Sequence, residues 1–196
     1  MRRNQDLPLV KHALSFFALA ASCQIAFAGD EWVSRSTFIK PNNCGISVKV
    51  PANTFLGNGF NAEIPKKLKA VAHIESLAFN FECRSSNDEV VNSGWARFDP
   101  KGNTWGVNFF DDKDKKQREN FTKFSLLENK NSRGWLVTVS DFTGEEKFRE
   151  KKLYFCLTHL EKAVCGWGSV GLLVDGKRGD LTSYVTKIVR SIEFID

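Results

Sequence analysis

The sequence predicts an α+β fold in which a mostly antiparallel sheet of six to eight strands is covered by one or two helices. Between Ile46 and Val174, short segments alternate apolar and polar residues, which is the period of a half-buried strand. From Leu181 the apolar spacing becomes helical, and the last residues alternate again. This change predicts a C-terminal helix followed by a short strand. No repeat, low-complexity tract or Pro/Gly/Ser-rich linker divides the 196-residue chain.

The first 28 residues have the pattern of a cleavable signal peptide. Arg2, Arg3 and Lys11 carry the positive charge. The apolar run that follows, residues 13–21, is too short to span the ~30 Å hydrocarbon core of a membrane. Alanines stand first and third before the bond that follows Ala28, and signal peptidase accepts such small residues there. We therefore expect cleavage after Ala28 and a periplasmic protein with no transmembrane segment in the remaining chain.

A second processing site also fits the sequence. Residues 20–23 (Ala-Ala-Ser-Cys) resemble a lipoprotein cleavage site, after which Cys23 would carry a lipid anchor. The number of cysteines favours the cut after Ala28, because removal of Cys23 leaves four of five cysteines, which can pair completely. The expected organisation is a signal peptide over residues 1–28 and a single disulfide-bonded globular domain over residues 29–196.

The charge of the expected mature chain is small and mixed. Removal of residues 1–28 takes away three basic residues and one acidic residue, so the formal net charge falls from +5 to +3. Basic and acidic residues are interleaved in runs such as 111–116 and 145–147. Nucleic-acid binding gathers one sign of charge on one face, so we expect no nucleic-acid partner.

The N-terminal two thirds of the expected domain contain the first predicted strands. Residues 46–50 and 77–83 each place apolar side chains on one face. Residues 95–98 and 105–110 flank an Asp-Pro-Lys-Gly turn and are predicted to form a hairpin. Residues 136–140 form a further predicted strand after an Arg-Gly break.

Residues 152–174 predict a hairpin that carries a disulfide. If Leu160 and Glu161 form a two-residue turn, Cys156 faces Cys165 in a non-hydrogen-bonded pair, where side chains are closest. Leu-Glu is unusual in such a turn, and a four-residue loop would keep the same register.

The hairpin pairing leaves Cys44 to pair with Cys83, although four cysteines allow three connectivities. In the chain-entropy model, closing loops of about 40 and about 10 residues stabilises the fold by roughly 4 and 3 kcal/mol.

Four apolar residues on one face predict the C-terminal helix. Asp180 is expected to cap its N-terminus, and Lys187 and Arg190 lie near its end, where the helix dipole favours cations. The apolar face consists of Leu181, Val185, Ile188 and Ile192. Residues 61–72 fit a second helix, which a proline interrupts, and residues 116–128 fit a helix or a strand.

No catalytic or cofactor motif has the surroundings that its chemistry needs. Residues 166–171 match G-x-G-x-x-G, but strand-like residues follow instead of a helix, so we expect a closely packed strand. The Arg-Gly-Asp tripeptide at 178–180 is explained by a turn and a helix cap. The two histidines of the expected mature chain, His73 and His159, lack zinc spacing; we expect His73 half-buried and His159 solvated at the hairpin turn. We expect no enzymatic activity, cofactor or metal.

Two charged loops are the predicted contact surfaces for a protein partner. One loop follows the strand over residues 105–110, and the other is the turn of the C-terminal hairpin. Aromatic residues inside a charged rim are typical of protein interfaces, and Phe121 extends the first loop. Three aspartates of that loop also have part of a calcium-loop pattern, without its glycine. The predicted partner-binding residues are Phe109, Phe110, Asp111, Asp112, Asp114, His159 and Glu161.

Several features of the C-terminal part occur together in one known family. They are the hairpin with Cys156-Leu157 and Cys165-Gly166, a glycine-containing strand, the C-terminal helix and the ending Ile-Val-Arg-Ser-Ile-Glu-Phe over residues 188–194. With these features the chain resembles small periplasmic proteins of the PsbP-like α/β/α sandwich type, and residues 45–51 are similar to their first strand. Several immunity proteins for type VI secretion effectors share this architecture. The resemblance implies a periplasmic protein that covers a toxin's active site.

These observations lead us to expect an exported, non-enzymatic inhibitor of the immunity type, which binds and neutralises a toxin or hydrolase by steric occlusion. One alternative is an envelope accessory module that binds lipid, cell wall or a membrane complex, which a large apolar pocket or a lipid on Cys23 would favour. The other is a secreted hydrolase with an unrecognised site, which His73 or His159 clustered with carboxylates in a cleft would favour.

Overall fold

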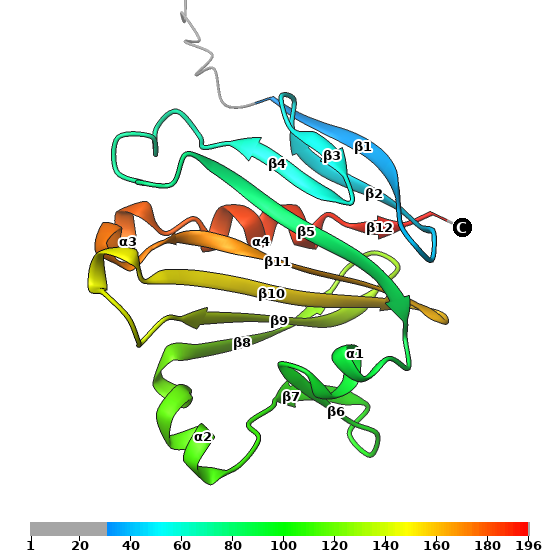
Figure 1. Ribbon diagram of the computed structural model, residues 1–196. Coiled ribbons are helices and arrows are strands. Elements are labelled where there is room, and N and C mark those ends of the chain that lie inside the picture. The colour runs from blue at the N-terminus through cyan, green and yellow to red at the C-terminus, as the bar shows by residue number, and fades with distance from the viewer. Residues whose placement is uncertain (1–30, 196) are drawn as a thin grey trace, which may run out of the picture.

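The computed structural model describes residues 31–195 and has three layers built around one large sheet (Figure 1). The predicted signal peptide, its cleavage site after Ala28 and the alternative lipid site at Cys23 lie outside the described residues. Within residues 31–195, no helix is both long and apolar enough to cross a membrane.

The central layer is a seven-stranded sheet in which every neighbouring pair of strands is antiparallel. The middle strands of the sheet have apolar residues on both faces and so contribute to a core on each side. On β10, Leu153, Phe155 and Leu157 enter one core, whereas Tyr154 and Cys156 enter the other. In spatial order the strands are β3 (Phe55–Gly57), β4 (Gly59–Glu63), β5 (Ser76–Ser85), β11 (Lys162–Leu172), β10 (Glu150–His159), β9 (Arg133–Ser140) and β8 (Thr122–Glu128).

One face of this sheet is covered by a second sheet and the C-terminal helix. The second sheet has the order β1 (Trp32–Ile39), β2 (Cys44–Pro51) and β12 (Glu193–Phe194), and the helix is α4 (Thr182–Arg190). The larger core lies between these elements and the central sheet. The short helices η3 (Leu173–Asp175) and α3 (Gly176–Gly179) connect β11 to α4.

The opposite face is covered by the chain between β5 and β8, below the sheet in Figure 1. This layer consists of α1 (Glu89–Ser93), the hairpin of β6 (Ala96–Asp99) and β7 (Thr104–Val107), α2 (Asp112–Arg118) and the short helix η1 (Glu119–Phe121). Its core is aromatic, with Trp105 and Trp135 buried and Trp95, Phe98 and Tyr154 packed around them. A last short helix, η2 (Glu146–Phe148), lies between β9 and β10.

The C-terminal hairpin and both disulfides have the predicted pairing. Cys156 faces Cys165 across β10 and β11, with Cα atoms 4.0 Å apart, and Leu160 adopts a positive φ of 52° in the two-residue turn. The other disulfide joins Cys44 on β2 to Cys83 on β5, so it connects the covering sheet to the central sheet. Two disulfides are compatible with an exported protein.

The C-terminal helix and final strand are also confirmed, with a small change at the cap. The helix begins at Thr182, so Leu181 occupies the N-cap position. Asp180 lies one residue earlier, and its carboxylate accepts a hydrogen bond from the Thr182 N–H (2.9 Å). The predicted apolar face of the helix is buried, and β12 pairs with β2.

Four expectations about the elements are wrong in detail. The fold is richer in sheet than predicted, because β1, β2 and β12 form a second covering sheet beside α4. Residues 61–72 contain no helix, since β4 pairs with β5 there and the proline begins a series of turns. The return strand of the 95–110 hairpin ends at Val107 rather than Phe110. His73 is exposed, not half-buried.

Candidate functional site

A patch of aromatic side chains at the two ends of α2 is the first candidate site. We define the α2 patch as Phe110, Arg118, Phe121 and Phe142. Asp111 begins the helix, because its side chain accepts a hydrogen bond from the Asp114 N–H (2.7 Å). Acidic residues in the first turn and basic residues in the last turn complement the helix dipole. The helix is thus specified by capping and charge, since none of its residues is buried.

Arg118 contacts the aromatic rings near the N-terminal end of α2. Its guanidinium forms an ion pair with Asp114, one turn earlier, and lies over the rings of Trp95, Phe109 and Phe110 at 5.0, 5.8 and 5.7 Å from their centroids. The hydrogen bond from Arg118 lowers the pKa of the Asp114 carboxyl, and the Phe110 N–H, which also donates to it, contributes in the same direction. Phe110 is therefore held by its backbone while 79 % of its surface remains exposed.

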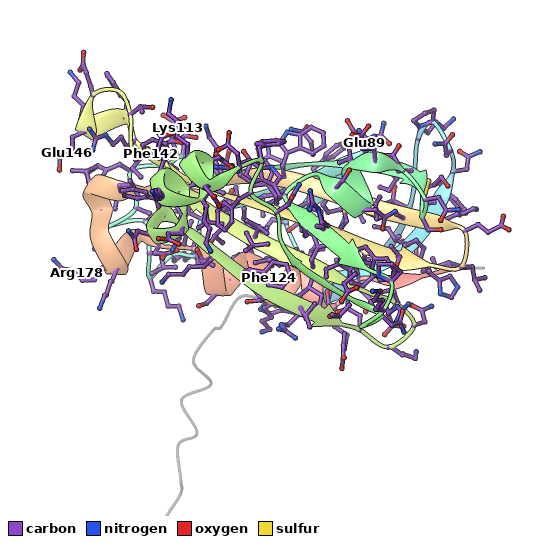
Figure 2. The ribbon with its side chains drawn as sticks, turned by 90° about the horizontal axis from the view of Figure 1, so that it is seen from below. Glu89, Lys113, Phe124, Phe142, Glu146 and Arg178 are labelled. Atoms are coloured by element: carbon purple, nitrogen blue, oxygen red, sulfur yellow. A yellow bond between two sulfur atoms is a disulfide. The ribbon has the colours of Figure 1, made fainter. Side chains whose placement is uncertain are left out.

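Phe121 and Phe142 form the second half of the patch. Their rings stack with centroids 5.2 Å apart, although Phe142 belongs to the loop after β9. In the view from below (Figure 2), Phe142 is drawn next to α2. Both rings are partly exposed, so the contact leaves apolar surface facing solvent.

The predicted loop residues fall into two groups. Phe110 is exposed as expected, whereas Phe109 is half-buried, because the chain leaves β7 and turns it toward Arg118. Asp111 and Asp114 have the local roles of helix cap and ion-pair partner, and Asp112 is exposed in the first turn. Within residues 31–195, no group of three or more His, Cys, Asp or Glu side chains is arranged to hold a metal ion.

The second predicted loop, the β10–β11 turn, lies elsewhere on the molecule. In Figure 1 this turn is at the right edge, whereas α2 is at the lower left. His159 is not freely solvated: its Nδ1 lies 2.6 Å from the Asn131 carbonyl oxygen, and its ring stacks on Phe194 at 5.2 Å. Glu161 is exposed. A groove of about 500 Å³ runs beside the turn and is lined by Gly45, His159, Leu160, Glu161, Lys162, Phe194 and Ile195.

His73 has a carboxylate partner that sequence reasoning missed. Its Nδ1 contacts the Asp175 carboxylate, whose other oxygen accepts a hydrogen bond from the His73 backbone N–H (2.9 Å). The Asp175 side chain is fully buried, but the His73 side chain is 73 % exposed. The pair fastens the loop before β5 to η3.

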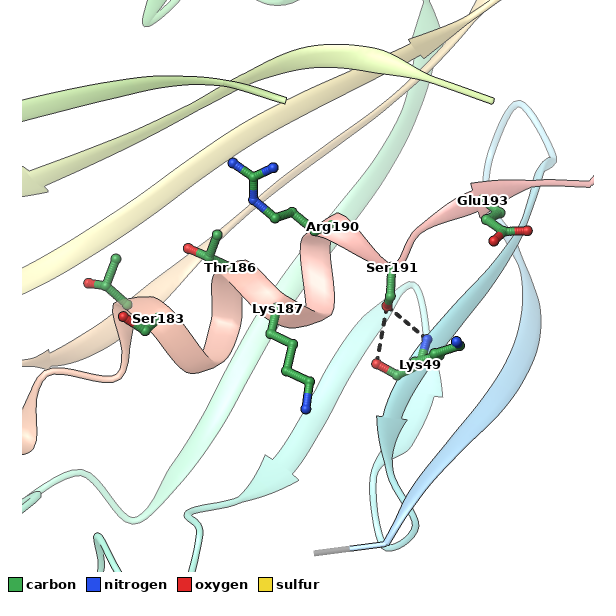
Figure 3. A pocket seen from close by; sticks show the side chains of 8 residues that line it. Lys49, Ser183, Thr186, Lys187, Arg190, Ser191 and Glu193 are labelled. Carbon is green, nitrogen blue, oxygen red and sulfur yellow. Dashed lines mark hydrogen bonds between the residues drawn. The ribbon is translucent and has the colours of Figure 1, made fainter. Parts of the chain in front are cut away.

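A basic groove lies along the outer side of α4 (Figure 3). Its volume is about 580 Å³, and Lys49, Lys187 and Arg190 line it together with four hydroxyl side chains and Glu193. Lys187 lies over the Trp32 ring at 4.0 Å, and Figure 3 shows Lys187 and Arg190 pointing away from each other. The Ser191 hydroxyl is engaged with the Lys49 backbone. The cations therefore do not converge on one point.

No protein-family model and no curated protein matches the chain.

Proposed function

We propose that this chain is an exported, non-enzymatic protein that binds another protein through the α2 patch and neutralises a toxin or hydrolase by covering its active site. The observation that carries this proposal is Phe110, a large apolar side chain that is mostly exposed while its backbone N–H is bonded to Asp114 of α2. An exposed aromatic ring that is already held in place loses little conformational entropy when a partner covers it. Such rings are typical of the few residues that supply most of the affinity of an interface.

The surroundings of Phe110 have the composition of a protein interface. Phe121 and Phe142 add aromatic surface at the other end of α2, while Lys113 and Asp112 provide a charged rim. Arg118 stacks on the rings and is a residue type common at the centre of interfaces. The resemblance to PsbP-like periplasmic proteins, which include immunity proteins, supports a toxin or hydrolase as the partner.

The experiment is capture of a partner by the oxidised protein, expressed from the full chain and recovered after export. Envelope and secreted fractions of the source cells are passed over wild-type and Phe110→Ala baits, and bound proteins are identified by mass spectrometry. We expect one hydrolase or toxin that the wild type captures and inhibits and that Phe110→Ala captures poorly.

Phe55→Ala is the matched control, because Phe55 is 74 % exposed on β3, away from α2. Both substitutions remove an exposed ring, so each should change the free energy of unfolding by less than about 0.5 kcal/mol. A partner that both variants retain, or a partner that keeps its full activity when bound, would contradict the proposal.

A further inference from the structure

A pocket of about 380 Å³ lies over the Cys156–Cys165 disulfide, on the face of the central sheet that is covered by the chain between β5 and β8. It is formed where β5, β10 and β11 meet α1 and the start of β6, and Trp95, which lines it, also lies under the Arg118 guanidinium of the α2 patch. Its size is near the lower end of the range of small-molecule sites. The side chains that give it its chemistry are Glu82, Arg84, Trp95, Trp135, Tyr154 and Trp167.

Aromatic rings form the walls of this pocket. The strand register places Trp167 on β11 directly opposite Tyr154 on β10, and Tyr154 packs against Trp95 with ring centroids 4.7 Å apart. Trp135 is buried, and its Nε1–H donates to the Val91 carbonyl oxygen (2.9 Å). Trp167 remains 37 % exposed, so its indole is the accessible ring among fixed neighbours.

An ion pair between Glu82 and Arg84 forms the polar end of the pocket. Glu82 and Arg84 project from the same face of β5 and form an ion pair, and Arg84 also binds both oxygens of Asp88 (3.2 Å each). Burial lowers the pKa of Arg84, but hydrogen bonds and charges from Glu82 and Asp88 outweigh it and raise the pKa. The Arg84 Nε–H is buried and has no acceptor among the described residues. A donor of this kind is costly unless a ligand or water satisfies it.

We propose that this pocket binds a neutral saccharide. A pyranose ring has an apolar face of C–H groups, which can lie against the Trp167 indole, and a rim of hydroxyl groups that both donate and accept hydrogen bonds. The Glu82 carboxylate can accept from one hydroxyl while Arg84 donates to its neighbour. Because Arg84 is already paired with the carboxylates of Glu82 and Asp88, the pocket has no uncompensated positive charge with which to select an anionic ligand.

Titration of the exported protein with three neutral oligosaccharides, cellotetraose, maltotetraose and chitotetraose, tests the proposal. Binding is followed by tryptophan fluorescence and by the shifts of backbone amide NMR signals. We expect at least one sugar to bind with a millimolar or lower Kd and to shift the signals of β5 and β11 around Glu82 and Trp167. Trp167→Ala should weaken that binding about tenfold or more, because it removes the stacking ring.

Two further variants separate the ligand site from the fold. Glu82→Gln keeps the shape of the side chain and should also weaken binding, whereas Phe55→Ala, which removes an exposed ring elsewhere, should leave it unchanged. Circular dichroism confirms that each variant is folded. The proposal is overturned if none of the three sugars binds, if bound sugar shifts signals away from the pocket, or if both pocket variants bind as the wild type does. Binding of decaproline at the pocket without any sugar binding would identify a peptide site instead.

Discussion

Removal of the Cys44–Cys83 disulfide should destabilise the protein more than removal of Cys156–Cys165. The first bond joins residues 39 apart in sequence and connects the covering sheet to the central sheet, with Cα atoms 5.5 Å apart. The second joins residues nine apart on strands that already pair along their whole length. In the chain-entropy model, the two closed loops contribute about 4 and about 3 kcal/mol, and their difference is about 1.2 kcal/mol.

Urea unfolding of the exported protein measures this difference. The variants are the double substitutions Cys44→Ala with Cys83→Ala and Cys156→Ala with Cys165→Ala. All four side chains are buried, so alanine introduces comparable cavities and avoids the burial of hydroxyl groups. We expect the first variant to have the lower free energy of unfolding, by roughly 1 kcal/mol. Equal losses for the two variants, or a larger loss for the Cys156/Cys165 variant, would refute the claim that the Cys44–Cys83 bond constrains the fold more strongly.

Two further predictions concern the stability of the fold. Hydrogen bonds from Lys151 and Thr182 outweigh burial and hold the pKa of Asp180 below its usual value of 3.8, so this stabilisation is present above pH 3.8 and is lost as pH falls through the lowered pKa. Asp180→Asn should therefore lower the free energy of unfolding by about 0.5–1 kcal/mol at neutral pH, and this free energy should fall less as the solution is acidified. Urea unfolding across pH measures both effects, and an acid dependence equal to that of the wild type would contradict the prediction. Gly166→Ala would place a Cβ atom 2.5 Å from the buried Phe155 ring and should cost about 1–3 kcal/mol in the same assay. A Cβ atom at Gly106 meets no atom within 4 Å, so Gly106→Ala serves as the control. Equal losses of unfolding free energy for the two variants would contradict the prediction.

The elements with regular periodicity could be predicted from the sequence. The strands around Val48 and Phe79 bury one face because apolar residues alternate there. The disulfide hairpin followed from counting outward from Leu160 and Glu161, since strand pairing fixes which residues face each other. The helix after Asp180 was predicted by a spacing that only one face of a helix can satisfy.

The rest depends on contacts between distant segments, which local patterns do not contain. Asn129 and Asn131, in the β8–β9 loop, bind backbone groups of the C-terminal segment about 60 residues later, and nothing in their surroundings indicates this role. In the α2 patch, Phe110 was predicted because it stands beside charged residues. Phe142 was missed because it reaches the patch only through the loop after β9.

The same limit applies to the pocket over the Cys156–Cys165 disulfide. Trp167 lies in a glycine-rich strand that was expected to be closely packed, and Gly166 and Gly168 do approach neighbouring phenylalanines closely. The exposure of Trp167 follows from how much of that face the chain between β5 and β8 covers. Glu82 and Arg84 look like ordinary outward-facing strand residues until β11 and α1 are placed beside them.

The affinity of the captured partner for three variants tests the central claim most directly. Calorimetric titration would compare the wild type with Phe110→Ala in the α2 patch, Leu160→Ala at the β10–β11 turn and Phe55→Ala on β3. The account predicts that Phe110→Ala weakens binding about tenfold or more, while the other two variants stay within about twofold of the wild type. Wild-type affinity for Phe110→Ala, together with a large loss for Leu160→Ala, would contradict it and would place the interface at the hairpin turn.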